Sequence, residues 1–168
     1  MVTVTGEILL PCSPEEAWVA LGRRSMYLRF PGVTRGTKAS HPLHLTLDLP
    51  IVDRVEQHAT LSVGRAPRTG RRERRFALRG PLVDIAGRWQ LEPCDEGVRL
   101  RVTLGYEIAA ALKEHAVNTL RSRSPLPIRT DADAILSRAV DEFFETRLAE
   151  QAAACCDAVR AHLAGLPA

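Results

Sequence analysis

The residues best suited to chemistry are concentrated in one basic stretch, Arg65–Gly80, which holds seven arginines in a chain of formal net charge +3. A guanidinium can grip a carboxylate through two parallel hydrogen bonds, so this stretch could attract an anionic ligand. Nucleic-acid binding generally adds aromatic platforms or a groove-reading helix, and aromatic residues make up only 5% of the chain. We therefore expect either the solvated rim of a β-hairpin or an attractor for a carboxylate-bearing ligand, with nucleic acid the least favoured partner.

Three polar side chains are candidates for acid–base catalysis, because strand alternation groups them with apolar neighbours on one face of a sheet. Arg74 alternates with Phe76 and Leu78, so we expect it to point inward or to lie at the rim of a cavity. Tyr106 could direct its hydroxyl into that cavity as a hydrogen-bond donor, and His41 shares the inward parity of the leucines that follow it. Each also has a structural interpretation, as a rim arginine, a packing tyrosine and a structural histidine.

An apolar ligand would need lining residues from several strands and from a helix. Trp89 has inward parity on its strand, while Phe143 and Arg147 lie one turn apart on a predicted helix, where they could present an apolar wall and a charge. The alternatives are a core tryptophan, a core phenylalanine and a surface arginine. The predicted ligand-binding residues are Phe76, Leu78, Trp89, Leu104, Tyr106, Val140, Phe143 and Arg147.

The four cysteines indicate neither a metal site nor a disulfide framework. Cys12 and Cys94 are isolated, and Cys155 and Cys156 are neighbours in a helical stretch, where adjacent side chains diverge by about 100° and cannot readily share a tetrahedral site. The sequence also contains no HExxH, GxSxG, GxGxxG, P-loop or CxxC motif. We therefore expect no metal, no cofactor and ordinary buried thiols.

Length and composition favour a single domain spanning residues 1–168. The chain has 45% apolar and 26% charged residues, and a domain of this size can bury roughly two-thirds of its unfolded surface. Its first residues carry no basic leader, and no apolar run approaches the roughly 18 residues that span a bilayer. We expect a cytoplasmic protein without a transmembrane segment.

The elements that must position the candidate residues begin with a strand and a capped helix. The β-branched segment 2–10 predicts a strand that ends at a proline. Ser13 as the cap and Glu16 three residues later have capping-box spacing, and Gly22 offers a stop. Because Pro and Gly interrupt the next segment, 23–33, we expect it to form a bent pair of short helices with the first helix, rather than one long helix.

A long run of strands follows. Apolar and polar residues alternate with period two, which predicts strands with one buried face, and the connections carry short turn sequences typical of an antiparallel meander. The predicted strands cover residues 44–49, 55–63, 73–80, 85–93 and 98–108.

The final third of the chain predicts a helix that covers the sheet. Thr130 is a plausible cap and Gly165 a plausible end, which gives a helix about 45 Å long at 1.5 Å per residue. Residues 109–123 predict a smaller helix before it. The apolar face of the long helix comprises Ile135, Leu136, Ala139, Val140, Phe143, Phe144 and Leu148.

Taken in order, these elements resemble the START-like superfamily, also called SRPBCC or Bet v 1-like. The residues that carry the resemblance are "ILLPCSPEEAWVAL" and "GRWQLEPCDEGVRLRVTLGYEI". The resemblance implies an α+β helix-grip fold, in which a curved antiparallel sheet wraps a long C-terminal helix around a ligand cavity, with two short helices after the first strand. It is closest to the polyketide cyclase/dehydrase and coenzyme-Q-binding-like branch.

The chain departs from that superfamily pattern at two places. Where the family has a tryptophan after the first helix, "SMYLRF" offers Tyr27 and Phe30. Residues 109–130 are longer than the usual link to the final helix, which suggests an added cap over the cavity mouth.

The resemblance implies several alternative functions, because one fold can host many unrelated activities. The leading hypothesis is binding or carriage of a hydrophobic small molecule, such as a lipid, isoprenoid quinone or polyketide. The second is a polyketide aromatase/cyclase acting on a poly-ketone, with His41, Arg74 and Tyr106 as candidate catalytic residues. The third is a module that captures a protein partner through the basic hairpin. An exposed edge strand could also pair two copies into a homodimer.

Overall fold

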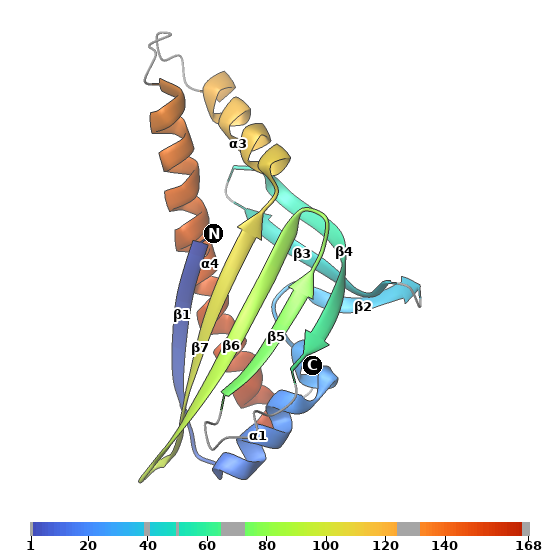
Figure 1. The fold of residues 1–168 in the computed structure, drawn as a ribbon, viewed down its shortest axis with the longest axis vertical. Coiled ribbons are helices and arrows are strands. Elements are labelled where there is room, and N and C mark those ends of the chain that lie inside the picture. The colour runs from blue at the N-terminus through green and yellow to red at the C-terminus, as the bar shows by residue number, and fades with distance from the viewer. Residues whose placement is uncertain (1, 39–40, 50, 65–72, 124–131, 166–168) are drawn as a thin grey trace.

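A curled antiparallel sheet and a long C-terminal helix form the two layers of the molecule (Figure 1). This computed structural model describes residues 2–38, 41–49, 51–64, 73–123 and 132–165. The sheet has seven strands in the order β1-β7-β6-β5-β4-β3-β2, so β1 and β2 are its two edges. The strands are β1 (Val2–Leu10), β2 (Val33–Lys38), β3 (His41–Leu49), β4 (Asp53–Val63), β5 (Glu73–Arg79), β6 (Val83–Cys94) and β7 (Gly97–Ile108).

Two short helices, α1 (Pro14–Gly22) and α2 (Arg24–Tyr27), follow β1, and two longer ones, α3 (Ala110–Arg123) and α4 (Ala132–Leu163), follow the sheet. The predicted capping box is present: the Ser13 hydroxyl accepts from the Glu16 amide at 3.2 Å, and the Glu16 carboxylate accepts from the Ser13 amide at 2.8 Å. The hydrogen bonds that the Glu16 carboxylate accepts from the Ser13 amide and hydroxyl hold the pKa of Glu16 below its usual range. The α+β helix-grip prediction is confirmed.

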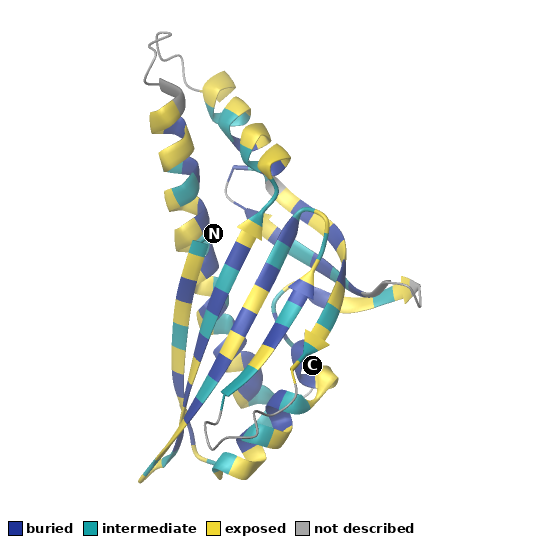
Figure 2. Cartoon of the chain, in the orientation of Figure 1, coloured by how far each residue is buried: buried dark blue, intermediate teal, exposed yellow. Residues whose placement is uncertain are grey.

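The predicted inner and outer faces of the strands are also confirmed. Buried and exposed residues alternate along β6 and β7, and Figure 2 shows the same alternation as bands across the sheet. The inner residues form one apolar core with α4, in which Trp89, Phe144 and Leu148 are nearly inaccessible to solvent. The proposed cap Thr130 and the arginines at 65–72 lie outside the described residues.

One strand is missing from the sequence-based prediction. The strand β2 begins at Val33, inside the segment 23–33 for which the sequence predicts the second helix of the pair, and it pairs only with β3. Val33 is the one residue of 33–37 that is buried, so this edge strand has no apolar alternation for a periodicity argument to detect.

A buried glutamine joins β4 to the start of β6. The Gln57 side chain accepts from the Leu82 and Val83 amides at 2.8 and 3.0 Å and donates to the Val83 carbonyl at 2.6 Å. Gln57 is the one buried polar residue among the described residues, and these bonds satisfy both ends of its amide. It therefore fixes the β5–β6 turn against β4.

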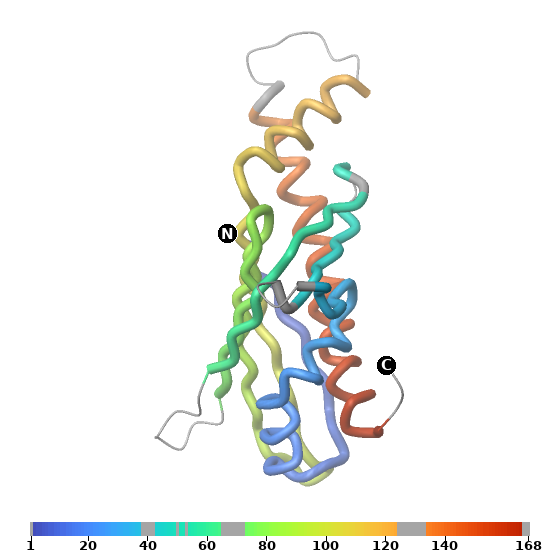
Figure 3. The backbone as a smooth tube through the Cα atoms, turned by 90° about the vertical axis from the view of Figure 1, so that its right-hand side faces the viewer, coloured from blue at the N-terminus to red at the C-terminus, as the bar shows by residue number. Residues whose placement is uncertain are grey.

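The helix α4 lies along the concave side of the sheet and packs mainly on β1 and β7 (Figure 3). A side-chain carbon at Gly6 would lie 2.8 Å from the Ala152 carbonyl oxygen, so β1 can approach α4 this closely only with glycine there. Beyond the sheet, α3 packs on the N-terminal half of α4, joined by a 2.7 Å ion pair between Lys113 and Asp141.

Candidate functional site

A small cavity lies between the sheet and α4. Its volume is about 10 Å³, close to the minimum that holds one water molecule. Apart from the polar side chain of Gln151, the hydroxyl of Tyr106 and the thiol of Cys155, its wall is apolar. The lining residues are Phe30, Pro31, Val33, Leu45, Leu47, Phe76, Leu78, Ile85, Leu104, Tyr106, Gln151 and Cys155.

The Tyr106 hydroxyl is the clearest polar group in this wall. Tyr106 is 2% exposed. Burial, and to a lesser degree the neighbouring Cys155 thiol, raise the pKa of Tyr106 well above its ordinary value. The hydroxyl therefore stays protonated at neutral pH and can donate to an acceptor that enters the cavity.

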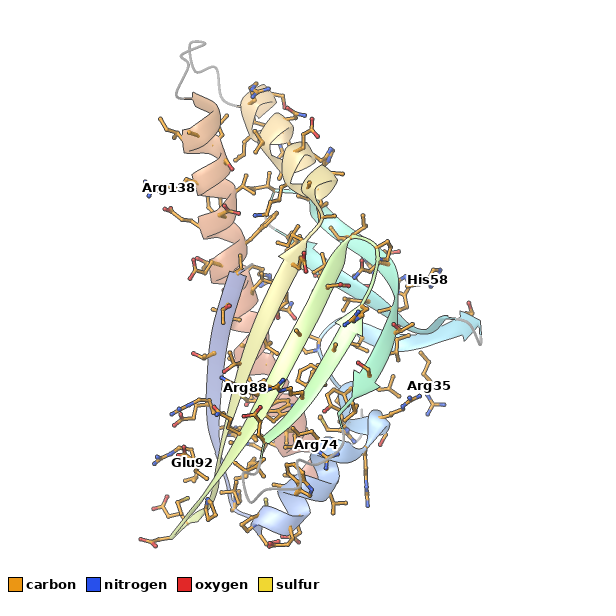
Figure 4. All side chains as sticks on the ribbon, in the orientation of Figure 1. Arg35, His58, Arg74, Arg88, Glu92 and Arg138 are labelled. Atoms are coloured by element: carbon orange, nitrogen blue, oxygen red, sulfur yellow. The ribbon has the colours of Figure 1, made fainter. Side chains whose placement is uncertain are left out.

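Behind Phe76 lies a second group of polar atoms, which we name the Arg74 cluster: Trp18, Tyr27, Arg74 and Trp89. Arg74 and Trp89 are directly opposite each other on β5 and β6, and the guanidinium carbon of Arg74 lies 4.2 Å from the centre of the Trp18 ring. Figure 4 shows Arg74 between the sheet and α1. The cluster thus joins two strands to the helices α1 and α2.

Two donors in the Arg74 cluster are buried without an acceptor of regular geometry. Nε of Arg74 has no hydrogen-bond partner among the described residues, and Nε1 of Trp89, which interacts with the Tyr27 hydroxyl, makes no hydrogen bond of regular geometry to them. The Tyr27 hydroxyl, which donates to the Leu21 carbonyl at 2.8 Å, has its pKa raised by burial, while the Trp89 N–H and the Arg74 charge oppose that rise. Because orphaned buried donors are costly, they mark a place where an oxygen acceptor would be stabilised.

Aromatic rings separate the Arg74 cluster from the cavity. Phe76 lines the cavity on one side, and on the other it stacks on Trp89 at 5.7 Å and contacts Tyr27 at 5.0 Å between ring centres. A side-chain carbon at Gly87 would overlap the Phe76 ring, so glycine is required for the ring to lie across β6. The cluster is one side chain away from the cavity.

An open groove of about 540 Å³ lies on the outer side of α4, beside the ends of β3 and β4. Arg147 crosses it, donating from Nε to the Asp48 carbonyl at 3.2 Å and pairing with Glu150 at 2.5 Å. Phe143, on the same helix, is 49% exposed. The groove, which we name the outer groove, is lined by Asp48, Leu49, Arg54, Phe143, Thr146, Arg147 and Glu150.

The structure places the predicted site residues in different environments. Phe76, Leu78, Leu104 and Tyr106 line the cavity together, whereas Phe143 and Arg147 line the outer groove. Two others, Trp89 and Val140, are buried in the core away from the cavity wall. His41 begins β3, but its side chain lies outside the described residues.

Several cavity residues do not appear in the sequence-based prediction. Leu45 and Leu47 have the inward parity that was available from the alternation of β3, so that signal could have found them. By contrast, Gln151 and Cys155 lie one turn apart on α4, and nothing local distinguishes them from other residues of a long helix. Tyr27, a member of the Arg74 cluster that the sequence offers in place of the family's tryptophan, belongs to a four-residue helix, too short for a periodicity signal to give it a role.

No group of three or more metal-ligating side chains occurs among the described residues. The four cysteines are free, and burial raises the pKa of the Cys155 thiol and raises that of Cys156 to about 11. Both remain protonated thiols at neutral pH, in which form they are poor metal ligands. Within the described parts of the chain, no helix is long and apolar enough to cross a membrane.

The fold, but not the sequence, is similar to that of known proteins. No protein-family model and no curated protein matches the sequence. Among solved structures, TTHA0849 from Thermus thermophilus is similar over 97% of both chains, with a TM-score of 0.58 and 14% identity. A conserved protein from Geobacillus kaustophilus is similar over 98% of this chain and 96% of its own, with a TM-score of 0.55 and 15% identity.

A third solved structure is the di-domain ARO/CYC protein BexL from the BE-7585A biosynthetic pathway. It matches 98% of this chain with a TM-score of 0.56 and 11% identity, and the match covers 50% of BexL. These likenesses extend over nearly the whole chain. The chain therefore shares the fold of these structures, an α+β helix-grip in which a curled antiparallel sheet holds a long C-terminal helix.

Proposed function

We propose that the protein binds or carries a hydrophobic small molecule between the sheet and α4. The observation that carries this proposal is an apolar cavity between the sheet and α4 whose wall includes the buried side chain of Tyr106. Apolar walls with a few convergent polar groups are typical of small-molecule sites. A lipid, isoprenoid quinone or polyketide with an oxygen acceptor near one end fits this chemistry.

Binding requires the cavity to open, because its present volume of about 10 Å³ holds no such molecule. Opening is easiest beside β3, since α4 packs mainly on β1 and β7. There the cavity-lining residues Leu47 and Gln151 are adjacent in sequence to Asp48 and Glu150, which line the outer groove. The ligand would pass through the outer groove, and the Arg147–Asp48 hydrogen bond would break on opening.

The first test is mass spectrometry of the gently purified protein, native and after organic extraction, together with titration of anilinonaphthalene sulfonate. Leu104→Phe fills the cavity wall, whereas Leu100→Phe places the same bulk on the same strand and face outside the cavity. We expect the first variant to lose the co-purifying compound and most probe binding, and the second to keep both.

Two results would count against the proposal. One is an empty protein that binds no probe; the other is equal loss in both variants, which would indicate general overpacking. Because Phe143 lines the outer groove, Phe143→Ser serves as a control for probe that binds only at the surface.

A second candidate function is cyclisation of a poly-ketone. The observation in its favour is the pair of orphaned donors in the Arg74 cluster, supported by the likeness to the ARO/CYC protein BexL. Donors fixed before the reaction stabilise an enolate oxygen as its charge develops. Here the Arg74 guanidinium would stabilise the enolate, while Tyr106 would hydrogen-bond a second ketone from the opposite side of Phe76.

Turnover distinguishes this candidate from carriage. Arg74→Met, Tyr106→Phe and His41→Ala would each be assayed for cyclisation of a poly-ketone substrate, alongside probe binding. If all three retain the wild-type rate, the residue assignment is wrong. If no turnover is detected in wild-type protein that binds the probe, carriage alone stands.

A further inference from the structure

The N-terminal half of α4 has an exposed apolar stripe, of which only Phe143 also lines the outer groove. Ile135 is 63% exposed and Phe143 is 49% exposed, with the smaller, half-buried Ala139 midway between them. These residues follow one another at intervals of four, so they lie on the same side of the helix. Figure 1 shows this half of α4 at the margin of the molecule, beside α3.

The charges beside the stripe are self-complementary. Arg138 is exposed and Glu142 lies one turn further along α4, and neither has an ion-pair partner among the described residues. Figure 4 shows the Arg138 side chain pointing away from the rest of the protein. Their order within the helix, with the arginine first, is the weaker arrangement for an internal pair.

We propose that a second copy of this chain docks on the stripe, with the two α4 helices antiparallel about a two-fold axis near Ala139. At 1.5 Å per residue, this axis brings Ile135 level with Phe143 of the partner subunit. It also brings Arg138 within about 3 Å, along the helix axis, of Glu142 of the partner subunit. Arg138 and Glu142 lie on the same side of the stripe, and the two-fold axis places this side of one helix beside the same side of its partner. The ion pair between Arg138 and Glu142 of the partner subunit therefore forms twice.

The size of the stripe predicts a weak dimer. The stripe spans two helical turns, well short of the roughly 1,000 Å² of buried surface that a stable interface needs. A large residue at each end and Ala139 in the middle let the two helices approach closely at the axis. We expect concentration-dependent association in the micromolar range.

Charge reversal tests this geometry directly by sedimentation velocity. In Arg138→Glu, the introduced acid faces Glu142 of the partner subunit at two symmetric places, so the dissociation constant should rise by at least about tenfold. Glu142→Arg should have the same effect, by opposing Arg138. An equimolar mixture of the two variants should associate again, because each heterodimer restores opposite charges at both contacts, and the double variant should associate as wild type does.

Ile135→Ser tests the apolar contact, with Val19→Ser as its control, since Val19 is 52% exposed on α1, away from the stripe. We expect only the first to weaken association. Circular dichroism checks that each variant is folded. A wild-type protein that stays monomeric up to about 1 mM would overturn the proposal. So would single reversals that associate like wild type, or a mixture of the two that stays monomeric.

Discussion

Replacement of Gly87 by alanine is the sharpest test of how the aromatic wall is built. The added carbon would lie 2.7 Å from Cε2 of Phe76 and closer still to Cε1 and Cζ, well inside the 3.4 Å at which ordinary contact begins. Phe76 has little room to move, because it is packed against Tyr27, Phe30 and Trp89 at 5.0 to 5.7 Å between ring centres. Overpacking of this kind costs about 1–3 kcal/mol, or roughly 3–10 °C in melting temperature for a chain of this length.

A double-mutant cycle separates this clash from other costs. Phe76→Leu alone should cost about 1 kcal/mol by loss of packing, but it removes the ring atoms that the new carbon meets. The double variant should therefore be more stable than the sum of the single effects by about 1–2 kcal/mol, measured by urea unfolding followed by circular dichroism. Ala86→Val, on the solvent side of the same strand, should change stability by less than about 0.5 kcal/mol. Additive effects of Gly87→Ala and Phe76→Leu would refute the reasoning.

Four further predictions follow from contacts described above. Gln57→Ala leaves the Leu82 and Val83 amides and the Val83 carbonyl without their partner. It should lower the free energy of unfolding by about 2–4 kcal/mol, measured by urea titration. An unchanged free energy of unfolding would contradict the role of this side chain. Arg74→Met removes a buried donor that has no acceptor among the described residues, so the melting temperature should stay level or rise, and a large fall would show that the donor is paired. Burial raises the pKa of Tyr106 in the folded state, so the folded state is stabilised as long as the phenol is neutral in both states. That stabilisation is fully present below the unfolded pKa of about 10 and is lost as the pH rises above it. Tyr106→Phe should therefore flatten the alkaline fall in melting temperature. Arg147→Gln should speed uptake of anilinonaphthalene sulfonate severalfold in stopped-flow mixing with little change in stability, since it breaks an exposed bridge from α4 to β3.

Much of the fold could be predicted because its local signals agree with its tertiary structure. The capping box at Ser13 and the alternation through β7 each indicate the element that forms, and the buried faces follow from the period alone. The strand β2 could not be found this way, because an edge strand with only Val33 buried has no apolar period.

The candidate site was less predictable, because parity gives the face of a strand but not the position along it. Trp89 and Phe76 have the same inward direction, yet Phe76 faces the cavity while Trp89 lies behind it. For a long helix, the sequence says even less about which residues of the apolar face are buried. Ile135 and Phe143 belong to the predicted apolar face, but both are exposed, 63% and 49%, because the sheet does not cover this side of α4.

The stacking of Phe76 on Trp89 has a spectroscopic consequence. Trp89 is fully buried, and the protein has only one other tryptophan, Trp18, which lies under the Arg74 guanidinium. A molecule that enters the cavity must press on the Phe76 ring and thereby change the surroundings of the Trp89 indole. In a Trp18→Phe background, the remaining emission would come from Trp89 alone. Its wavelength and lifetime would then report occupancy of the cavity without any added label.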